Sequence, residues 1–156
     1  MKKVLIALDY NPSAEKVAET GHRLAKSMDA EVVLLHVVSD FKYYASLNYS
    51  PIMGFDSFSN VIETEGTGEL KRIAQNYLDS TKKHLDDPTI KTSVKSGDFA
   101  RTIMDTAKEL GADIIVMGTH SRRGIEKILL GSVAENVLNH STIPLFIIPT
   151  RSLEEK

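Results

Sequence analysis

Cysteine is absent from the 156 residues of this chain. Without thiols the chain can form neither a disulfide framework nor a thiolate metal site, and its own side chains cannot carry out redox chemistry. The absence is compatible with a reducing compartment, so we expect a cytoplasmic protein. The chain is long enough to bury a substantial core, and we expect a single domain over residues 1–150 and a short tail over 151–156.

An excess of one charge and a long apolar run are missing as well. The 19 Lys and Arg residues nearly balance the 21 Asp and Glu residues, which gives no general electrostatic reason to bind nucleic acid or an anionic membrane. The apolar run after Met1-Lys2-Lys3 ends at Asp9, far short of a signal-peptide core or a membrane span. We therefore expect no nucleic-acid partner and no membrane insertion.

Common phosphate-binding and catalytic motifs are also lacking. Gly66-Thr67-Gly68 has no third glycine and no preceding strand, and no Gly-Lys-Ser/Thr sequence ends a Walker-type loop. No histidine and carboxylate residues have metal-ligand spacing, and neither Ser121 nor Ser132 lies in a Gly-x-Ser-x-Gly elbow. The sequence therefore predicts no catalytic residue and no metal site of its own.

Five segments carry the patterns of strands. Four are continuous apolar runs, over residues 4–8, 32–38, 114–117 and 145–148, and such runs are typical of strands buried on both faces of a parallel sheet. Residues 89–95 instead alternate apolar with polar side chains. This alternation predicts a half-exposed strand at the edge of the sheet.

Helical patterns alternate with these strands, which implies right-handed crossovers and a doubly wound α/β sheet. In such a sheet the ligand site lies beyond the carboxyl ends of the strands, where Asp9 and Gly118 are expected. The expected helices are residues 14–28 after Asn11 as N-cap and Pro12 at N1, residues 70–78 ending before Pro88, the stretch from Asp98 to Gly111 as C-cap, and a fourth helix from near Ser132.

The segment from Ser39 to Gly68 is polar and aromatic by turns. It is about twice as long as an unstructured loop in a compact domain usually is. Two interpretations stay open: the segment is partly helical, or it forms a mobile cover.

A glycine-punctuated loop joins the strand at 114–117 to the last helix. It begins at Gly118 and ends at Gly131-Ser132. Backbone N–H groups at a helix N-terminus are unpaired and carry partial positive charge, so a glycine turn that lets an anion approach them makes a phosphate site. The loop therefore predicts binding rather than catalysis.

The frame Gly118, two residues, Ser121, nine residues, Gly131-Ser132 resembles that of the universal stress protein family (UspA-like domain). Its nucleotide-binding members have glycine where Ser121 stands. Further resemblance covers residues 3–9, 33–37, 112–120, 130–137 and 144–148. The resemblance implies a five-stranded parallel sheet of order 3-2-1-4-5 with helices on both faces, a Rossmann-like fold of the adenine nucleotide alpha hydrolase-like type.

The resemblance also implies a site for ATP, or for ADP or AMP, with Mg²⁺ held only through the nucleotide. Asp9 and the main chain of Ala7 and Val37 would line the adenosine, with Met117 and Gly118 beside it, while Gly131, Ser132 and Val133 would hold phosphates. At most slow ATP hydrolysis is expected, because no base is positioned for it. The predicted nucleotide-binding residues are Ala7, Asp9, Val37, Met117, Gly118, His120, Ser121, Arg122, Gly131, Ser132 and Val133.

Ser121 is the one departure from the family frame. If the position needs a left-handed backbone, a serine there costs roughly 1–2 kcal/mol, or about a tenfold loss of affinity. Serine keeps its N–H and adds a hydroxyl, so weakened or retained binding is favoured over abolished binding.

Several of these residues also have structural interpretations. Ser132 and Glu135 have the spacing of a capping box, and Asp9 suits a turn before the first helix. The cationic residues of the loop suit a solvated surface as well as a phosphate. His36 fits the core or the wall of the site. The cationic loop residues are Arg122, Arg123 and Lys127. His22 and His140 are expected to be ordinary helix residues.

Residues 145–148 are wholly apolar and would form the sheet edge opposite residues 89–95. The resemblance implies a homodimer through this last strand, and an uncovered apolar edge invites such pairing. Two functions stay open: a nucleotide-binding switch of the stress response with an unknown regulatory partner, and a dimeric interaction module that does not bind nucleotide. An enzyme or a flavin-dependent electron carrier has no supporting motif.

Overall fold

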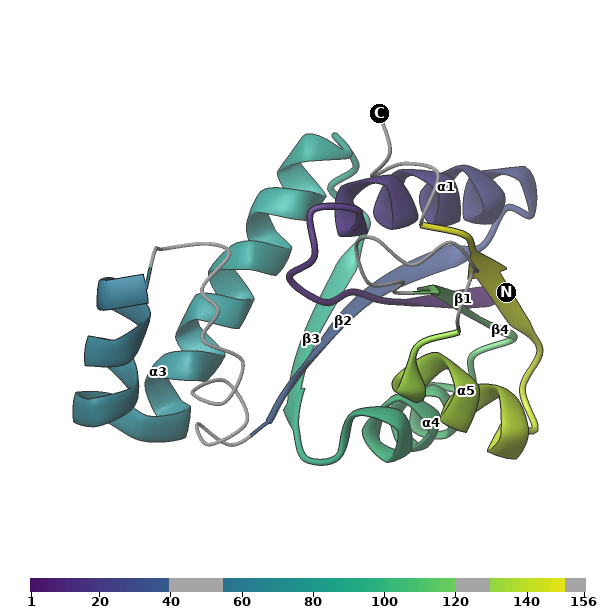
Figure 1. The fold of residues 1–156 in the computed structure, drawn as a ribbon. Coiled ribbons are helices and arrows are strands. Elements are labelled where there is room, and N and C mark those ends of the chain that lie inside the picture. Colours follow the sequence, from purple (N-terminus) through teal and green to yellow (C-terminus); the bar gives the residue numbers. More distant parts are fainter. Residues whose placement is uncertain (40–54, 120–129, 151–156) are drawn as a thin grey trace.

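The computed structural model describes residues 1–39, 55–119 and 130–150, with the side chains of 55–67 excepted. Its centre is one parallel sheet of five strands in the order β3-β2-β1-β4-β5 (Figure 1). This order and the α/β architecture confirm the predicted fold. The strands are β1 (Lys3–Ala7), β2 (Glu31–Val38), β3 (Lys91–Ser96), β4 (Ile114–Gly118) and β5 (Leu145–Ile148).

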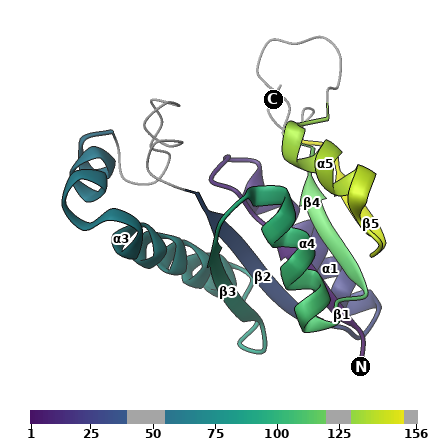
Figure 2. The same cartoon turned by 90° about the horizontal axis from the view of Figure 1, so that it is seen from below.

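Helices cover both faces of the sheet (Figures 1 and 2). On one face α1 and α3 pack on Ile6 and Leu34, and on the other α4 and α5 pack on Leu5 and Leu35. Neighbouring residues of a strand point to opposite faces, so the continuous apolar runs of β1 and β2 supply both cores. The helices are α1 (Ala14–Ser27), α3 (Phe55–His84), α4 (Phe99–Leu110) and α5 (Ser132–His140).

The ends of α4 are as predicted. Asp98 is the N-cap, and its carboxylate accepts a hydrogen bond from the Arg101 N–H at 3.0 Å. Gly111 at the other end has φ 66°, the left-handed backbone that glycine adopts without strain.

The predicted start of α1 is wrong. The helix begins at Ala14 with Ser13 as N-cap, rather than at Pro12 after Asn11. The side-chain oxygen of Asn11 accepts hydrogen bonds from the N–H and the hydroxyl of Ser13, at 2.9 and 2.7 Å. Asn11 therefore closes an Asx turn ahead of the helix, and this turn delays the helix by two residues.

The helix α3 begins much earlier than the predicted Leu70, and it ends at His84, before Pro88 as predicted. It begins at Phe55, so the segment from Ser39 to Gly68 is partly helical, the first of the two interpretations, while residues 40–54 lie outside the described residues. Figure 1 shows α3 extending beyond the β3 edge of the sheet. None of the helices among the described residues is long and apolar enough to cross a membrane.

The edge strand β3 begins two residues later than predicted. Thr89 belongs to a turn, in which its N–H and hydroxyl donate to the carboxylate of Asp87 at 3.0 and 2.6 Å. Ile90 is buried just before the strand. The partly exposed strand that follows confirms the prediction of an edge position.

Candidate functional site

The carboxyl ends of β1 and β4 lie side by side. The two strands are parallel neighbours, with Val4 opposite Ile114 and Ile6 opposite Val116. The chain leaves β1 toward β2 on one side and enters β5 from β4 on the other, so the strand order reverses between them. Ligands of open α/β sheets bind at such a point.

The structure brings together several predicted site residues at this edge. Ala7 ends β1 and Gly118 ends β4. Met117 and Val37 are buried in the core under α4 and α5, while Asp9 is exposed. His120, Ser121 and Arg122, together with Arg123 and Lys127, lie outside the described residues, so their roles stay predictions.

Gly118 is required by packing. A Cβ atom there would lie 2.8 Å from Cγ2 of Thr150 and 3.0 Å from Cγ2 of Val17. Its backbone is not left-handed, since the described glycines with positive φ are Gly97 and Gly111. The first glycine of the loop frame thus has a structural reason that is independent of any ligand.

The N-terminus of α5 is held against the end of β4. The Gly131 N–H donates to the carbonyl oxygen of Thr119 at 2.8 Å. Gly131 is the N-cap, and the first bond of the helix runs from the Glu135 N–H to the Gly131 carbonyl at 2.9 Å. The next three N–H groups, of Ser132, Val133 and Ala134, consequently have no acceptor within the helix.

This arrangement refines the predicted phosphate contacts. The N–H of Gly131 is already engaged by Thr119, so an anion here would use the N–H groups that follow it. These groups lie at the positive end of the α5 dipole. Ser132 is exposed, which keeps its hydroxyl in reach of solvent.

The predicted capping box of α5 is wrong. Ser132 is the first helical residue rather than the N-cap, and within the described part of the chain no side-chain hydrogen bond caps the helix. The extended backbone of Gly131, with φ −61° and ψ 157°, takes the N-cap position instead. The Ser132 hydroxyl is consequently not committed to the Glu135 N–H, which donates to the Gly131 carbonyl.

Asp9 lies in a turn that is fixed by several hydrogen bonds. Its Oδ1 accepts from the Asn11 N–H at 2.9 Å, which confirms the turn interpretation of this residue. Its carbonyl oxygen accepts from the hydroxyl of Tyr77 at 2.7 Å, and the preceding carbonyl, of Leu8, bonds to Nδ1 of His36 at 2.7 Å. The exposed Asp9 therefore sits on a constrained main chain.

His36 is buried, as the core interpretation predicted. Burial disfavours the charged imidazolium and lowers the pKa of His36, against the opposite effects of the Leu8 carbonyl and the Asp9 charge. Because a carbonyl only accepts, the neutral ring carries its proton on Nδ1.

The sequence analysis missed Thr119 and Thr150, which tie the end of β4 to the end of β5. Both side chains are buried and their hydroxyl oxygens lie 3.1 Å apart. The Thr150 N–H donates to the Thr119 hydroxyl at 3.1 Å, and the Thr119 N–H donates to the Ile148 carbonyl at 3.1 Å. A threonine soon after each of two neighbouring apolar strands was the signal available in the sequence.

A second missed contact joins His22 of α1 to Asp87 in the turn before β3. The two side chains are 2.8 Å apart, and Lys26 lies 3.1 Å from the same carboxylate oxygen. Hydrogen bonds from Thr89, His22 and Lys26 hold the pKa of Asp87 well below its usual range. His22 is therefore a paired residue rather than an ordinary helix residue, whereas His140 bonds to the Asn136 carbonyl within α5.

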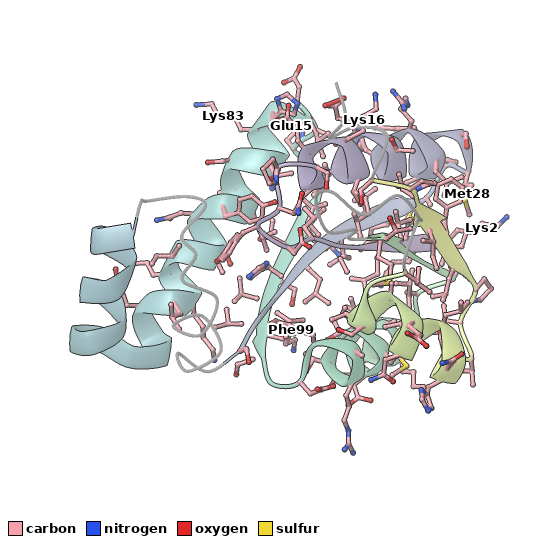
Figure 3. All side chains as sticks on the ribbon, in the orientation of Figure 1. Lys2, Glu15, Lys16, Met28, Lys83 and Phe99 are labelled. Atoms are coloured by element: carbon pink, nitrogen blue, oxygen red, sulfur yellow. The ribbon has the colours of Figure 1, made fainter. Side chains whose placement is uncertain are left out.

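Glu15, Glu19 and His84 also converge, a grouping that the sequence spacing did not indicate. Nε2 of His84 is 3.0 Å from Oε1 of Glu15 and 3.4 Å from Oε1 of Glu19. Figure 3 labels Glu15 at the start of α1 and Lys83 near the end of α3. Hydrogen bonding between side chains of α1 and α3 accounts for the convergence.

Comparison with known proteins identifies relatives over the whole fold. Residues 1–149 match the model of the Universal stress protein family. "Universal stress protein MJ0577" of Methanocaldococcus jannaschii is 31% identical over 157 residues, covering 97% of this chain and 96% of that protein. The solved structure of MJ0577 superposes with a TM-score of 0.68 at 29% identity and covers 95% of each chain.

Two structures of lower sequence identity share the fold and contain bound nucleotides. A universal stress protein in complex with cAMP has a TM-score of 0.62 at 19% identity, covering 96% of this chain and 97% of its own. A universal stress protein family protein of Arabidopsis thaliana with AMP bound has a TM-score of 0.64 at 19% identity, covering 100% and 96%.

Proposed function

Because this chain belongs to the universal stress protein family, we propose that it binds an adenine nucleotide at the carboxyl ends of β1 and β4. The observation that supports this most is the placement of α5. The Thr119–Gly131 hydrogen bond holds three N–H groups without a helical acceptor beside the switch point of the sheet. The adenine nucleotides bound by two fold neighbours agree with this proposal.

In this proposal the adenosine lies against the ends of the central strands. The main chain of Ala7 and Val37 faces the base, Met117 and Gly118 border the ribose, and Asp9 binds the ribose or a nucleotide-bound Mg²⁺. The phosphates then bind the Ser132 hydroxyl and the first N–H groups of α5. The N–H of Gly131 does not take part, because it donates to the Thr119 carbonyl. The proposed contacts from the loop are His120, Ser121 and Arg122.

We propose that the nucleotide, ATP or one of its products, acts as a regulatory ligand in the cytoplasm. Among the described residues no catalytic constellation surrounds the site, so hydrolysis would be slow at most. A ligand shifts a protein only by its different affinities for two states, and a regulatory partner would read that difference.

Identification of the nucleotide tests the proposal directly. The freshly purified protein is denatured and any released nucleotide is identified by mass spectrometry. The emptied protein is then titrated with Mg-ATP beside a Ser121→Gly variant. Stoichiometric adenine nucleotide, or similar affinities of the two proteins, supports the proposal. An empty protein that binds no nucleotide, with or without the glycine, refutes it.

A dimeric interaction module is the second candidate function, and it is favoured by the exposed apolar surface beside β5. Phe146 of this edge strand is 38% exposed. The strand is at the edge of the sheet, where an unpaired row of backbone groups can pair with a second copy. Sedimentation of the purified protein at micromolar concentration distinguishes a dimer from a monomer.

A further inference from the structure

Three aromatic rings from distant parts of the chain meet behind the Asp9 turn. Tyr10 follows β1, His36 lies in β2 and Tyr77 lies in α3. The rings of Tyr10 and His36 are stacked with centroids 4.2 Å apart, and Tyr77 meets Tyr10 edge-on at 5.1 Å. We call this set the aromatic bracket.

Two residues of the aromatic bracket form hydrogen bonds with two consecutive carbonyl groups. His36 donates to the Leu8 carbonyl and Tyr77 donates to the Asp9 carbonyl, both at 2.7 Å. The Asn11 N–H donates to the Asp9 carboxylate at 2.9 Å. Both the main chain and the side chain of Asp9 are therefore fixed in orientation, with contacts that come from β2 and α3 as well as from the turn.

The histidine of the bracket is retained at a cost to the fold. Its Nε2 is buried without a hydrogen-bond partner among the described residues, while its neighbours on the same strand face, Leu34 and Val38, are fully apolar. A leucine or valine at position 36 would continue the apolar strand without an unpaired nitrogen. What the histidine adds is the bond from Nδ1 to the Leu8 carbonyl.

Tyr77 connects the turn to α3. The same helix packs Leu70 and Ala74 against Val38 at the end of β2, and Leu78 into the core under α1. A shift of α3 along the sheet would move the Tyr77 hydroxyl relative to the Asp9 carbonyl. Any ligand that prefers one position of Asp9 would therefore prefer one position of α3, and the preference is reciprocal.

We propose that Tyr77 and His36 are positioning residues that set the orientation of Asp9, and that Tyr77 couples occupancy of the nucleotide site to the placement of α3. The effect on the turn is a property of the protein alone. The effect on the ligand rests on the proposed nucleotide-binding function.

Tyr77→Phe tests the proposal, because it removes the hydroxyl and keeps the ring. Thr81→Val is the matched control: it removes a hydroxyl from the same helix, one that bonds to the Tyr77 carbonyl at 3.0 Å and does not reach the turn. His36→Phe is a second variant that keeps a stacking ring and loses the donor. Near-ultraviolet circular dichroism verifies that each variant is folded.

The first measurement is amide hydrogen exchange of the ligand-free proteins over residues 8–14. Tyr77→Phe and His36→Phe are expected to accelerate exchange at Asn11, whose N–H bonds to Asp9, whereas Thr81→Val leaves it unchanged. The second is Mg-ATP affinity, which we expect to fall about three- to tenfold in Tyr77→Phe, the worth of one hydrogen bond. The third is exchange in α3, which saturating Mg-ATP should slow in the wild type but not in Tyr77→Phe.

The outcomes separate this proposal from the proposed function. If no protein binds nucleotide but Asn11 exchanges faster in Tyr77→Phe, the nucleotide function fails and the positioning role stands. If Asn11 exchange is unchanged in Tyr77→Phe, or equally faster in Thr81→Val, the positioning role is overturned. If wild-type protein binds Mg-ATP and exchange in α3 does not respond, the coupling through Tyr77 is overturned.

Discussion

Replacing Gly118 by alanine is expected to destabilise the protein even without any ligand. The added Cβ would lie 2.8 Å from Cγ2 of Thr150 and 3.0 Å from Cγ2 of Val17, closer than carbon atoms pack. Neither neighbour can withdraw easily, since Thr150 is hydrogen-bonded to Thr119 and Val17 is buried in α1. Overpacking of this kind costs about 1–3 kcal/mol.

The loss is measured by thermal denaturation of the ligand-free protein. For a chain of this size we expect the melting temperature to fall by roughly 2–4 °C for each kcal/mol lost. Thr150→Ser removes the Cγ2 methyl and keeps the hydroxyl, so the cost of Gly118→Ala should be smaller in that background than in the wild type. Gly68→Ala is the control, because no described atom lies within 4 Å of its added Cβ in α3, and it should stabilise by about 0.5–1 kcal/mol. If Gly118→Ala melts like the wild type, or Thr150→Ser brings no relief, the packing explanation of this glycine is refuted.

Three further predictions concern stability and assembly. The pKa of Asp87 is lowered by its partners in the folded state, so its contribution to the free energy of unfolding is complete above the ordinary carboxyl value, about pH 4, and is lost as the pH falls below it. Urea denaturation from pH 2 to 7 should show this loss in the wild type and a smaller one in Asp87→Asn; equal slopes would contradict it. Asp98→Ala should cost about 1 kcal/mol through loss of the α4 N-cap, with Asp98→Asn close to the wild type in thermal melts, and an unaffected alanine variant would dismiss the cap. Phe146→Lys should leave the melting temperature of the monomer nearly unchanged and abolish any dimer in sedimentation; a dimer that persists would exclude pairing through β5.

The elements that sequence predicted well are those with strong local signals. The apolar runs of β1 and β2 and the paired cap residues Asp98 and Gly111 each depend on neighbours in the chain. The contact of His22 with Asp87 was missed because 65 residues separate them and neither has a local pattern that predicts the other. In the long α3, the glycines at 66 and 68 weaken the helical pattern that the structure nevertheless continues.

The two incorrect cap predictions share a physical cause. Asn11 and Ser132 are both good N-cap residues, and in each case a neighbour takes the position. Asn11 is committed to a turn with Ser13, and Gly131 is held in an extended conformation where its N–H meets the Thr119 carbonyl. Competition of this kind between a local side-chain bond and a tertiary one is not visible in the sequence. The apolar runs located Ala7 and Gly118 at neighbouring strand ends, and the contributions of Ser121 and the loop cations stay predictions.

The hydrogen bond between Thr119 and Gly131 also affects how the fold tolerates substitutions between them. It joins the described chain on either side of residues 120–129, with the Gly131 N–H 2.8 Å from the Thr119 carbonyl oxygen, so the scaffold itself fixes the separation of these two ends. Once the ends are joined, doubling the length of a flexible loop costs only roughly 0.6 kcal/mol in entropy. We therefore expect the sheet and the start of α5 to keep their places when residues 120–129 are substituted, lengthened or replaced.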